Sequence, residues 1–155
     1  MRRSAACFGR TSTVAVVLGA VVALGAGCVP ASPDANTYRD AASQSIGTAV
    51  SELATIEEML RLLASDDIMR PAVVTQLRYS EDGLEKSTQW FTGLNPPTGS
   101  DGFGKRVGTL LQRGGNLLTE ARIAVHRGQV DRYTRIADDL KTLGDHLDKV
   151  EGRLS

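Results

Sequence analysis

The chain has 155 residues, carries 18 basic and 18 acidic side chains, and contains only two cysteines, Cys7 and Cys28. A neutral chain lacks the basic excess of nucleic-acid-binding domains, and two cysteines are too few for a disulfide framework. The roughly 120 residues that follow the first 30 are enough for the core of one domain. We therefore expect a single small domain with no nucleic-acid partner.

The first 27 residues have the three parts of a secretory signal. Three arginines and no acid lie in residues 1–10, and no charged residue then occurs before Asp34. The apolar stretch of about 15 residues is shorter than the roughly 20 that a membrane-spanning helix needs. We predict a cleaved signal peptide over residues 1–27. A permanent membrane helix and export through the twin arginines Arg2 and Arg3 are the alternatives.

The signal ends in Leu24-Gly25-Ala26-Gly27-Cys28, with small residues at the two positions before the cysteine. This segment resembles the lipobox of bacterial lipoproteins, although that family most often has leucine at the place of Gly25. The resemblance implies that Cys28 carries a diacylglyceryl group and becomes the first residue after cleavage. Two acyl chains hold a protein on a membrane far more firmly than one, because each buried methylene contributes about 0.8 kcal/mol. The alternative is an ordinary cysteine near a conventional cleavage site.

Residues 28–36 contain two prolines and no apolar period, so we expect an extended tether there. Beyond it, residues 37–155 are expected to form the folded domain. Apolar residues recur every three or four positions, as on one face of a helix, in four segments: residues 38–63, 71–91, 103–125 and 136–154.

Breaks in the pattern separate these four segments. Polar residues interrupt it at 65–67, Pro96 and Pro97 lie in a glycine-rich stretch at 93–102, and Gly128 follows two basic residues. Short connections favour antiparallel neighbours, so the pattern predicts an all-α, up-down four-helix bundle. The pair Gly114-Gly115 falls inside the third segment. Either a close helix crossing or a local kink would explain it.

The arrangement also resembles small helical lipoproteins, of unassigned function, from high-GC Gram-positive bacteria. The resemblance rests on the opening Tyr38-Arg39-Asp40-Ala41-Ala42, the Pro96-Pro97 loop and the stretch at residues 120–128. It covers most of the domain and supports the fold, but it implies no chemistry.

No catalytic or metal-binding pattern stands out in the sequence. Di-metal bundles need a glutamate three residues before a histidine, whereas Ile123 and Leu143 precede His126 and His146. Adjacent acids such as Glu57-Glu58 point about 100° apart on a helix, which does not suit a paired acid and base. We expect no enzyme activity, no cofactor and no metal.

The aromatic residues concentrate beside the proline loop, at Trp90 and Phe91. Core packing at a helix end and an exposed contact patch are both consistent with them. If the domain has a partner, we expect the contact at Trp90, Phe91, Pro96 and Pro97. The sequence therefore predicts a lipoprotein on the extracytoplasmic face of the cell membrane that contacts another envelope component. The alternative is a bundle that binds a small molecule or lipid, suggested by the gaps that Gly83 and Gly114-Gly115 leave in the apolar stripes.

Overall fold

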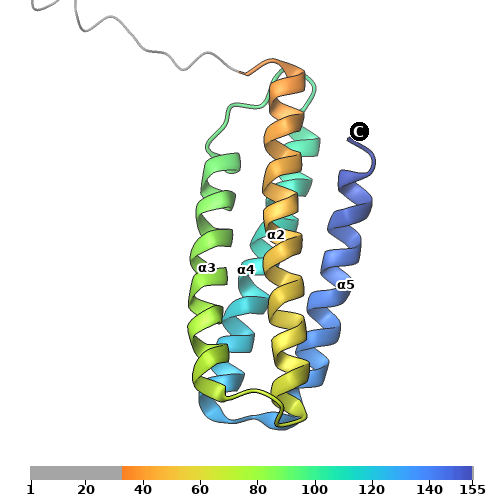
Figure 1. Ribbon diagram of the computed structural model, residues 1–155. Helices are drawn as coiled ribbons and strands as arrows, with labels where there is room; N and C mark the ends of the chain where they lie inside the picture. Colours follow the sequence, from red (N-terminus) through yellow and green to blue (C-terminus); the bar gives the residue numbers. More distant parts are fainter. Residues whose placement is uncertain (1–32, 155) are drawn as a thin grey trace, which may run out of the picture. The chain divides into compact units, whose positions relative to one another are not determined.

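The computed structural model describes residues 33–154, and within them the chain forms four long helices and one short 3-10 turn (Figure 1). The elements are α2 (Ala35–Ala64), α3 (Arg70–Thr92), α4 (Asp101–Arg127), η2 (Val130–Arg132) and α5 (Tyr133–Glu151). No strand occurs in this part of the chain.

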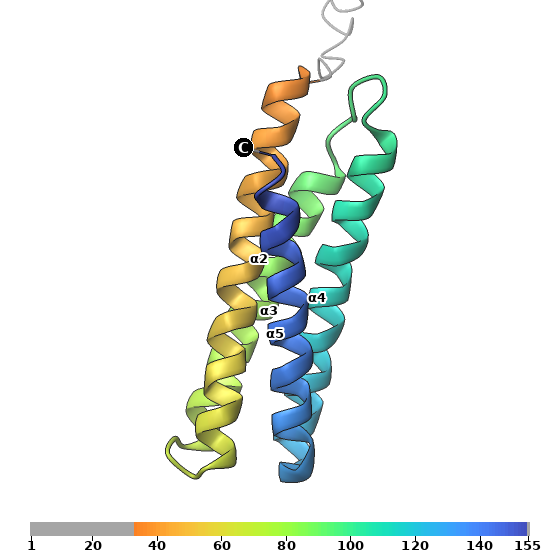
Figure 2. The same cartoon turned by 90° about the vertical axis from the view of Figure 1, so that its right-hand side faces the viewer.

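The four helices run alternately down and up, and each is antiparallel to the next (Figure 1). Helix α2 packs against α3 on one side and α5 on the other, and α4 closes the bundle between α3 and α5 (Figure 2). The predicted all-α, up-down four-helix bundle is confirmed. The start of α2, the 93–100 connection and the end of α5 lie at one end, while the other two connections lie at the opposite end (Figures 1 and 2).

The core consists of the apolar stripes that the sequence pattern predicts. In α5, for example, the spacing of four and three residues places one side of the helix against α2 and α4. Its fully or almost fully buried apolar residues include Ile136, Leu140, Leu143 and Leu147. In α3 the stripe is weaker because Ser80 occupies a fully buried position, where its hydroxyl lies 3.4 Å from Nε2 of Gln76. The helix nevertheless continues through this position.

Local capping fixes where the helices begin and end. Asp34 caps α2, since its carboxylate accepts hydrogen bonds from the backbone N–H groups of Asn36 and Thr37, both at 2.9 Å. The helix thus starts at Ala35, so the last two residues of the expected tether belong to it. Gly128 ends α4 with a φ of 64°, a left-handed conformation that glycine adopts without a Cβ penalty.

Interhelical ion pairs link the outer surfaces of the bundle. Arg61 of α2 contacts Asp138 of α5 at 2.8 Å, and Arg122 of α4 contacts Glu81 of α3 at 2.9 Å. Glu120 of α4 also accepts hydrogen bonds from arginines of η2 and α5. Two acids that have an acidic neighbour in the sequence, Glu81 and Asp138, therefore connect neighbouring helices.

Candidate functional site

The two aromatic residues predicted for a contact patch have opposite environments. Trp90 is 48% exposed, whereas Phe91 is only 1% exposed and belongs to the core. Consecutive residues of a helix point about 100° apart, and here the core lies on the side of Phe91. Phe91 is therefore not available for a partner, and the prediction for this residue is corrected. Trp90 remains an exposed large aromatic side chain.

Trp90 lies on the side of α3 that faces α2. Gly83 precedes it by seven residues, which is close to two helical turns, so the two positions share one face. A Cβ atom on Gly83 would lie 3.3 Å from the Glu52 carboxylate of α2. Tyr79, eleven residues before Trp90 and 68% exposed, lies on the same face. Two exposed aromatic side chains thus border the junction of α2 and α3.

The proline loop follows α3 at the end of the bundle where α2 begins (Figure 1). Pro96 and Pro97 are both half-buried. The Pro97 carbonyl accepts a hydrogen bond from the Ser100 N–H at 2.9 Å, and Gly99 within this turn has a φ of 87°. The two prolines shape the connection, and part of each is accessible at the surface.

The sequence pattern did not predict that Tyr38, near the start of α2, would belong to a buried aromatic cluster. Its ring packs against Phe91 with centroids 5.3 Å apart and meets the edge of Phe103 at 6.4 Å. The phenol is 3% exposed, and this burial raises its pKa, with a smaller effect from the nearby Asp101 carboxylate. A Cβ atom at Gly104 would lie only 2.2 Å from the Tyr38 hydroxyl oxygen, so glycine is required there. The three rings close the end of the core.

A groove with two adjoining parts follows the junction of α3 and α4. Its lower part, of about 540 Å³, lies between residues 81–89 of α3 and 111–119 of α4. Its upper part, of about 610 Å³, lies between residues 88–96 and residues 101–112, with Tyr38 at its end. Thr88 and Gln112 line both parts, and Pro96 lines the upper part. We call the whole feature the α3–α4 groove.

The glycines of α4 explain where this groove opens and where the helices touch. A Cβ atom at Gly108 would lie 3.3 Å from a methyl carbon of Thr92, so the two helices are close at this point. A Cβ atom at Gly115 would meet no atom within 4 Å. The neighbouring Gly114 points inward, where a Cβ would lie 3.0 Å from Leu84 and 3.6 Å from Leu53. Gly114 therefore makes room for leucine side chains of the neighbouring helices, and Gly115 leaves space in the groove.

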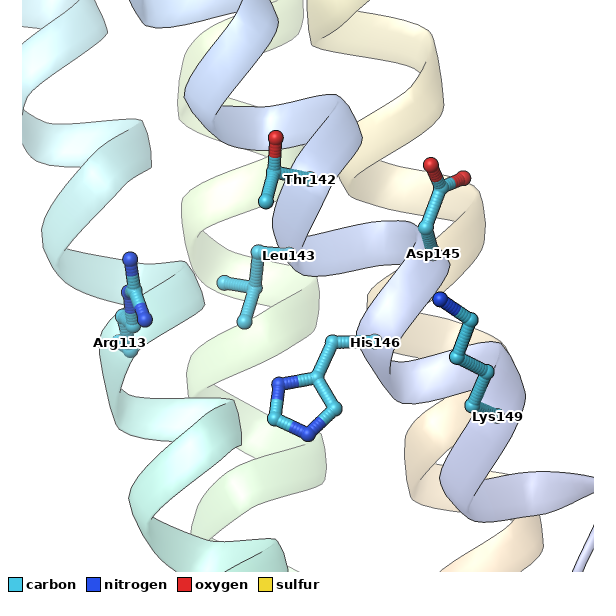
Figure 3. A pocket seen from close by; sticks show the side chains of 6 residues that line it. All are labelled: Arg113, Thr142, Leu143, Asp145, His146 and Lys149. Carbon is cyan, nitrogen blue, oxygen red and sulfur yellow. The ribbon is translucent and has the colours of Figure 1, made fainter.

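A smaller groove of about 270 Å³ lies between α4 and α5 (Figure 3). Arg113 projects from α4 and His146 from α5 toward the space between the helices, whereas Lys149 lies on the side of α5 away from α4 (Figure 3). Asp145 on that side already pairs with Lys141 at 3.1 Å. The basic side chains of this groove therefore do not converge on one point.

Residues 33–154 contain neither a metal-binding cluster nor a membrane-spanning helix. No group of three or more His, Asp or Glu residues in this range has the arrangement of a metal site. No helix there is long and apolar enough to cross a membrane. Cys28, the predicted site of lipid attachment, lies outside the described residues, as do the signal peptide and the first residues of the tether.

Comparison with known proteins identifies no relative of this chain. None of the family models, curated proteins or solved structures compared with the chain matches it significantly.

Proposed function

We propose that the protein is a lipid-anchored, extracytoplasmic lipoprotein whose helical domain contacts another component of the cell envelope without acting as an enzyme. The observation that carries the contact is the exposure of Trp90, at 48%, on a surface that also presents Tyr79. Tryptophan and tyrosine are enriched among the residues that dominate the free energy of protein association. An exposed pair on one helix face supports a role in binding.

The anchor rests on the sequence of the signal peptide and on the place where the folded domain begins. Asp34 caps the first helix only six residues after Cys28. Six extended residues span at most about 20 Å, so a lipid on Cys28 would hold this end of the bundle near the membrane. The 93–100 connection, which contains Pro96 and Pro97, lies at the same end of the bundle as the start of α2 (Figure 1). The proposed contact region is therefore the membrane-proximal part of the domain.

The anchor is tested by mass spectrometry of the membrane fraction. We expect a first residue Cys28 that bears a diacylglyceryl group, and we expect Cys28→Ala to abolish this modification. An unmodified Cys28, or mature protein that retains residues 1–27, would contradict the lipoprotein proposal.

The partner contact is tested separately by a photo-crosslinking amino acid placed at Trp90 in the full chain, in intact cells. Thr134 on α5 is exposed and provides the matched control position. We expect the probe at Trp90 to crosslink one envelope protein and the probe at Thr134 not to do so. Equal crosslinking at both positions, or none at either, would refute the contact through Trp90.

The alternative, a small molecule or lipid inside the bundle, was suggested by the glycine gaps. Gly114 is surrounded by leucine side chains, and the grooves described above open to the surface. The glycines therefore no longer motivate an internal ligand.

A further inference from the structure

One exposed face of α3 has the residue spacing of a helix–helix contact. It consists of Tyr79, Gly83, Lys86 and Trp90, and we call these four residues the α3 face. They are four, three and four residues apart, which places them within about 60° of one another around the helix. The same spacing occurs where two helices pack along each other. Tyr79 is 68% exposed, Trp90 is 48% exposed and Lys86 is exposed as well, so no other helix of the described chain covers these side chains.

The neighbouring helix α2 adds a carboxylate beside the α3 face. The two helices lie side by side (Figure 1), and a Cβ atom at Gly83 would lie 3.3 Å from an oxygen of Glu52. Neither Glu52 nor Lys86 forms an ion pair with any residue in the 33–154 range. Met59, seven residues after Glu52 and half-buried, lies on the same side of α2 and adds apolar surface. A partner that presents both a positive and a negative charge suits this surface.

The α3 face is complementary to a second copy of itself when the two α3 helices run antiparallel. A two-fold axis that crosses α3 between residues 84 and 85 exchanges position 79 with position 90, and position 83 with position 86. Trp90 of each copy then meets Tyr79 of the partner subunit. Lys86 of each copy meets the place of Gly83 of the partner subunit, where no side chain separates it from the Glu52 carboxylate. The symmetry makes each of these contacts twice.

The available surface is large enough for a specific pair. Helix α3 has 23 residues and is about 34 Å long, and α2 and α3 together are about 20 Å wide. This corresponds to about 700 Å² per copy, close to the roughly 800 Å² that each partner contributes to a standard interface. Tryptophan and tyrosine supply much of the free energy in such interfaces, because their rings bury a large area.

We propose that two copies of the protein pair through the α3 face, with their α3 helices antiparallel. This inference deepens the proposed function, on which it rests, because it names the envelope component as a second copy of this chain. The aromatic rings of Trp90 and Tyr79 pack across the interface, and Lys86 pairs with Glu52 of the partner subunit. The two α2 helices begin at opposite ends of the pair, so a pair anchored in one membrane lies along the membrane surface.

The photo-crosslinking amino acid at Trp90, in the full chain in intact cells, tests this inference through the identity of the product. We expect a product that contains two copies of the chain, in which position 90 is joined to the α3 segment that contains Tyr79. A product with a different protein would overturn the self-pairing and leave the proposed partner contact intact. A crosslink that joins position 90 to position 90 would overturn the antiparallel arrangement. Absence of any crosslink at Trp90 would refute both the pairing and the proposed contact.

Charge variants show whether Lys86 and Glu52 meet across the interface. Lys86→Glu should lower the yield of the two-copy product by at least about tenfold, because two pairs of like charges then face each other. Combining Lys86→Glu with Glu52→Lys should restore the yield, because opposite charges meet again. Lys149→Glu is the matched control and should leave the yield unchanged. Lys149 on α5 is also exposed and forms no ion pair with the described residues, but it lies outside the α3 face.

Unfolding midpoints of the purified full-length variants in detergent, measured by circular dichroism, separate loss of pairing from loss of fold. Lysine and glutamate have similar helix propensities and Lys86 is exposed, so we expect Lys86→Glu to remain folded. An unchanged yield of the two-copy product in folded Lys86→Glu would overturn the proposed pairing. Failure of the added Glu52→Lys to restore the yield would overturn it as well.

Discussion

The two adjacent glycines of α4 predict opposite effects of the same substitution. Alanine is more favourable than glycine inside a helix by about 1 kcal/mol. At Gly115 nothing opposes this gain, since no atom lies within 4 Å of the Cβ position. We therefore expect Gly115→Ala to raise the free energy of unfolding by about 0.5 to 1 kcal/mol.

At Gly114 the added methyl group meets the core. Its carbon would lie 3.0 Å from Cδ2 of Leu84, whereas carbon atoms pack best at about 3.5 to 4.0 Å. Leu84 is 1% exposed and has little room to move, and overpacking a core costs about 1 to 3 kcal/mol. The helix gain of about 1 kcal/mol offsets part of this cost, so we expect Gly114→Ala to lower stability by about 0 to 2 kcal/mol.

Urea unfolding of the chain from residue 29 onward, followed by circular dichroism, measures both effects. The difference between the two variants is the most informative quantity, because the helix-propensity gain is common to them and cancels. We expect Gly115→Ala to be more stable than Gly114→Ala by about 1 to 3 kcal/mol. Leu84→Val removes the contacted methyl carbon, so combining it with Gly114→Ala should give a favourable coupling. Equal stability of the two alanine variants would show that the tight leucine packing around Gly114 is wrong.

Three other predictions concern the ends of the bundle. Tyr133 is 1% exposed and its hydroxyl has no hydrogen-bond partner among the described residues, so Tyr133→Phe should leave stability unchanged or raise it by up to about 1 kcal/mol in urea unfolding. Gly104→Ala should lower stability by about 1 to 3 kcal/mol, because its Cβ would lie 2.2 Å from the Tyr38 hydroxyl, and Tyr38→Phe should restore most of the loss. The backbone hydrogen bond from Thr37, with further hydrogen bonds from Thr37 and Asn36, lowers the pKa of Asp34 below its ordinary value of 3.8. Its stabilising effect on α2 is therefore complete above pH 3.8 and is lost as the pH falls through the lower pKa of the folded state.

Each of these three predictions has a result that would contradict it. A large loss of stability in Tyr133→Phe would mean that the hydroxyl is hydrogen-bonded. Failure of Tyr38→Phe to rescue Gly104→Ala would mean that the phenolic oxygen is not the conflicting atom. For Asp34, the comparison is with Asp34→Asn, which can still cap the helix but does not titrate. A stability difference between these two chains that does not shrink as the pH is lowered would contradict the assigned pKa shift.

The fold could be predicted from the sequence because every helix has an apolar stripe with the helical period. In α5, Ile136, Leu140, Leu143 and Leu147 are all at most 2% exposed, as their spacing predicts. The connections were also predictable, since prolines, glycines and short polar segments interrupt the pattern where the helices end. Periodicity reports which face of a helix is buried, and four such faces with short connections leave few ways to pack.

Which candidate site residues are exposed, and which lie together, could not be predicted from the sequence and required the tertiary structure. The sequence placed Trp90 and Phe91 together, but only the direction of the core determines which of two adjacent residues is exposed. Tyr38 escaped prediction because its partners Phe91 and Phe103 are more than 50 residues away in the chain.

The sequence by itself determined the class of fold, the helix boundaries to within a few residues, and the resemblance of the segment ending at Cys28 to a lipobox. These properties are local: they depend on periodicity, capping residues and a short contiguous motif. The opposite environments of Gly114 and Gly115 and the groove between α3 and α4 arise only when two helices lie side by side. Tertiary structure decided these features because each depends on the distance between residues that the chain alone does not bring together.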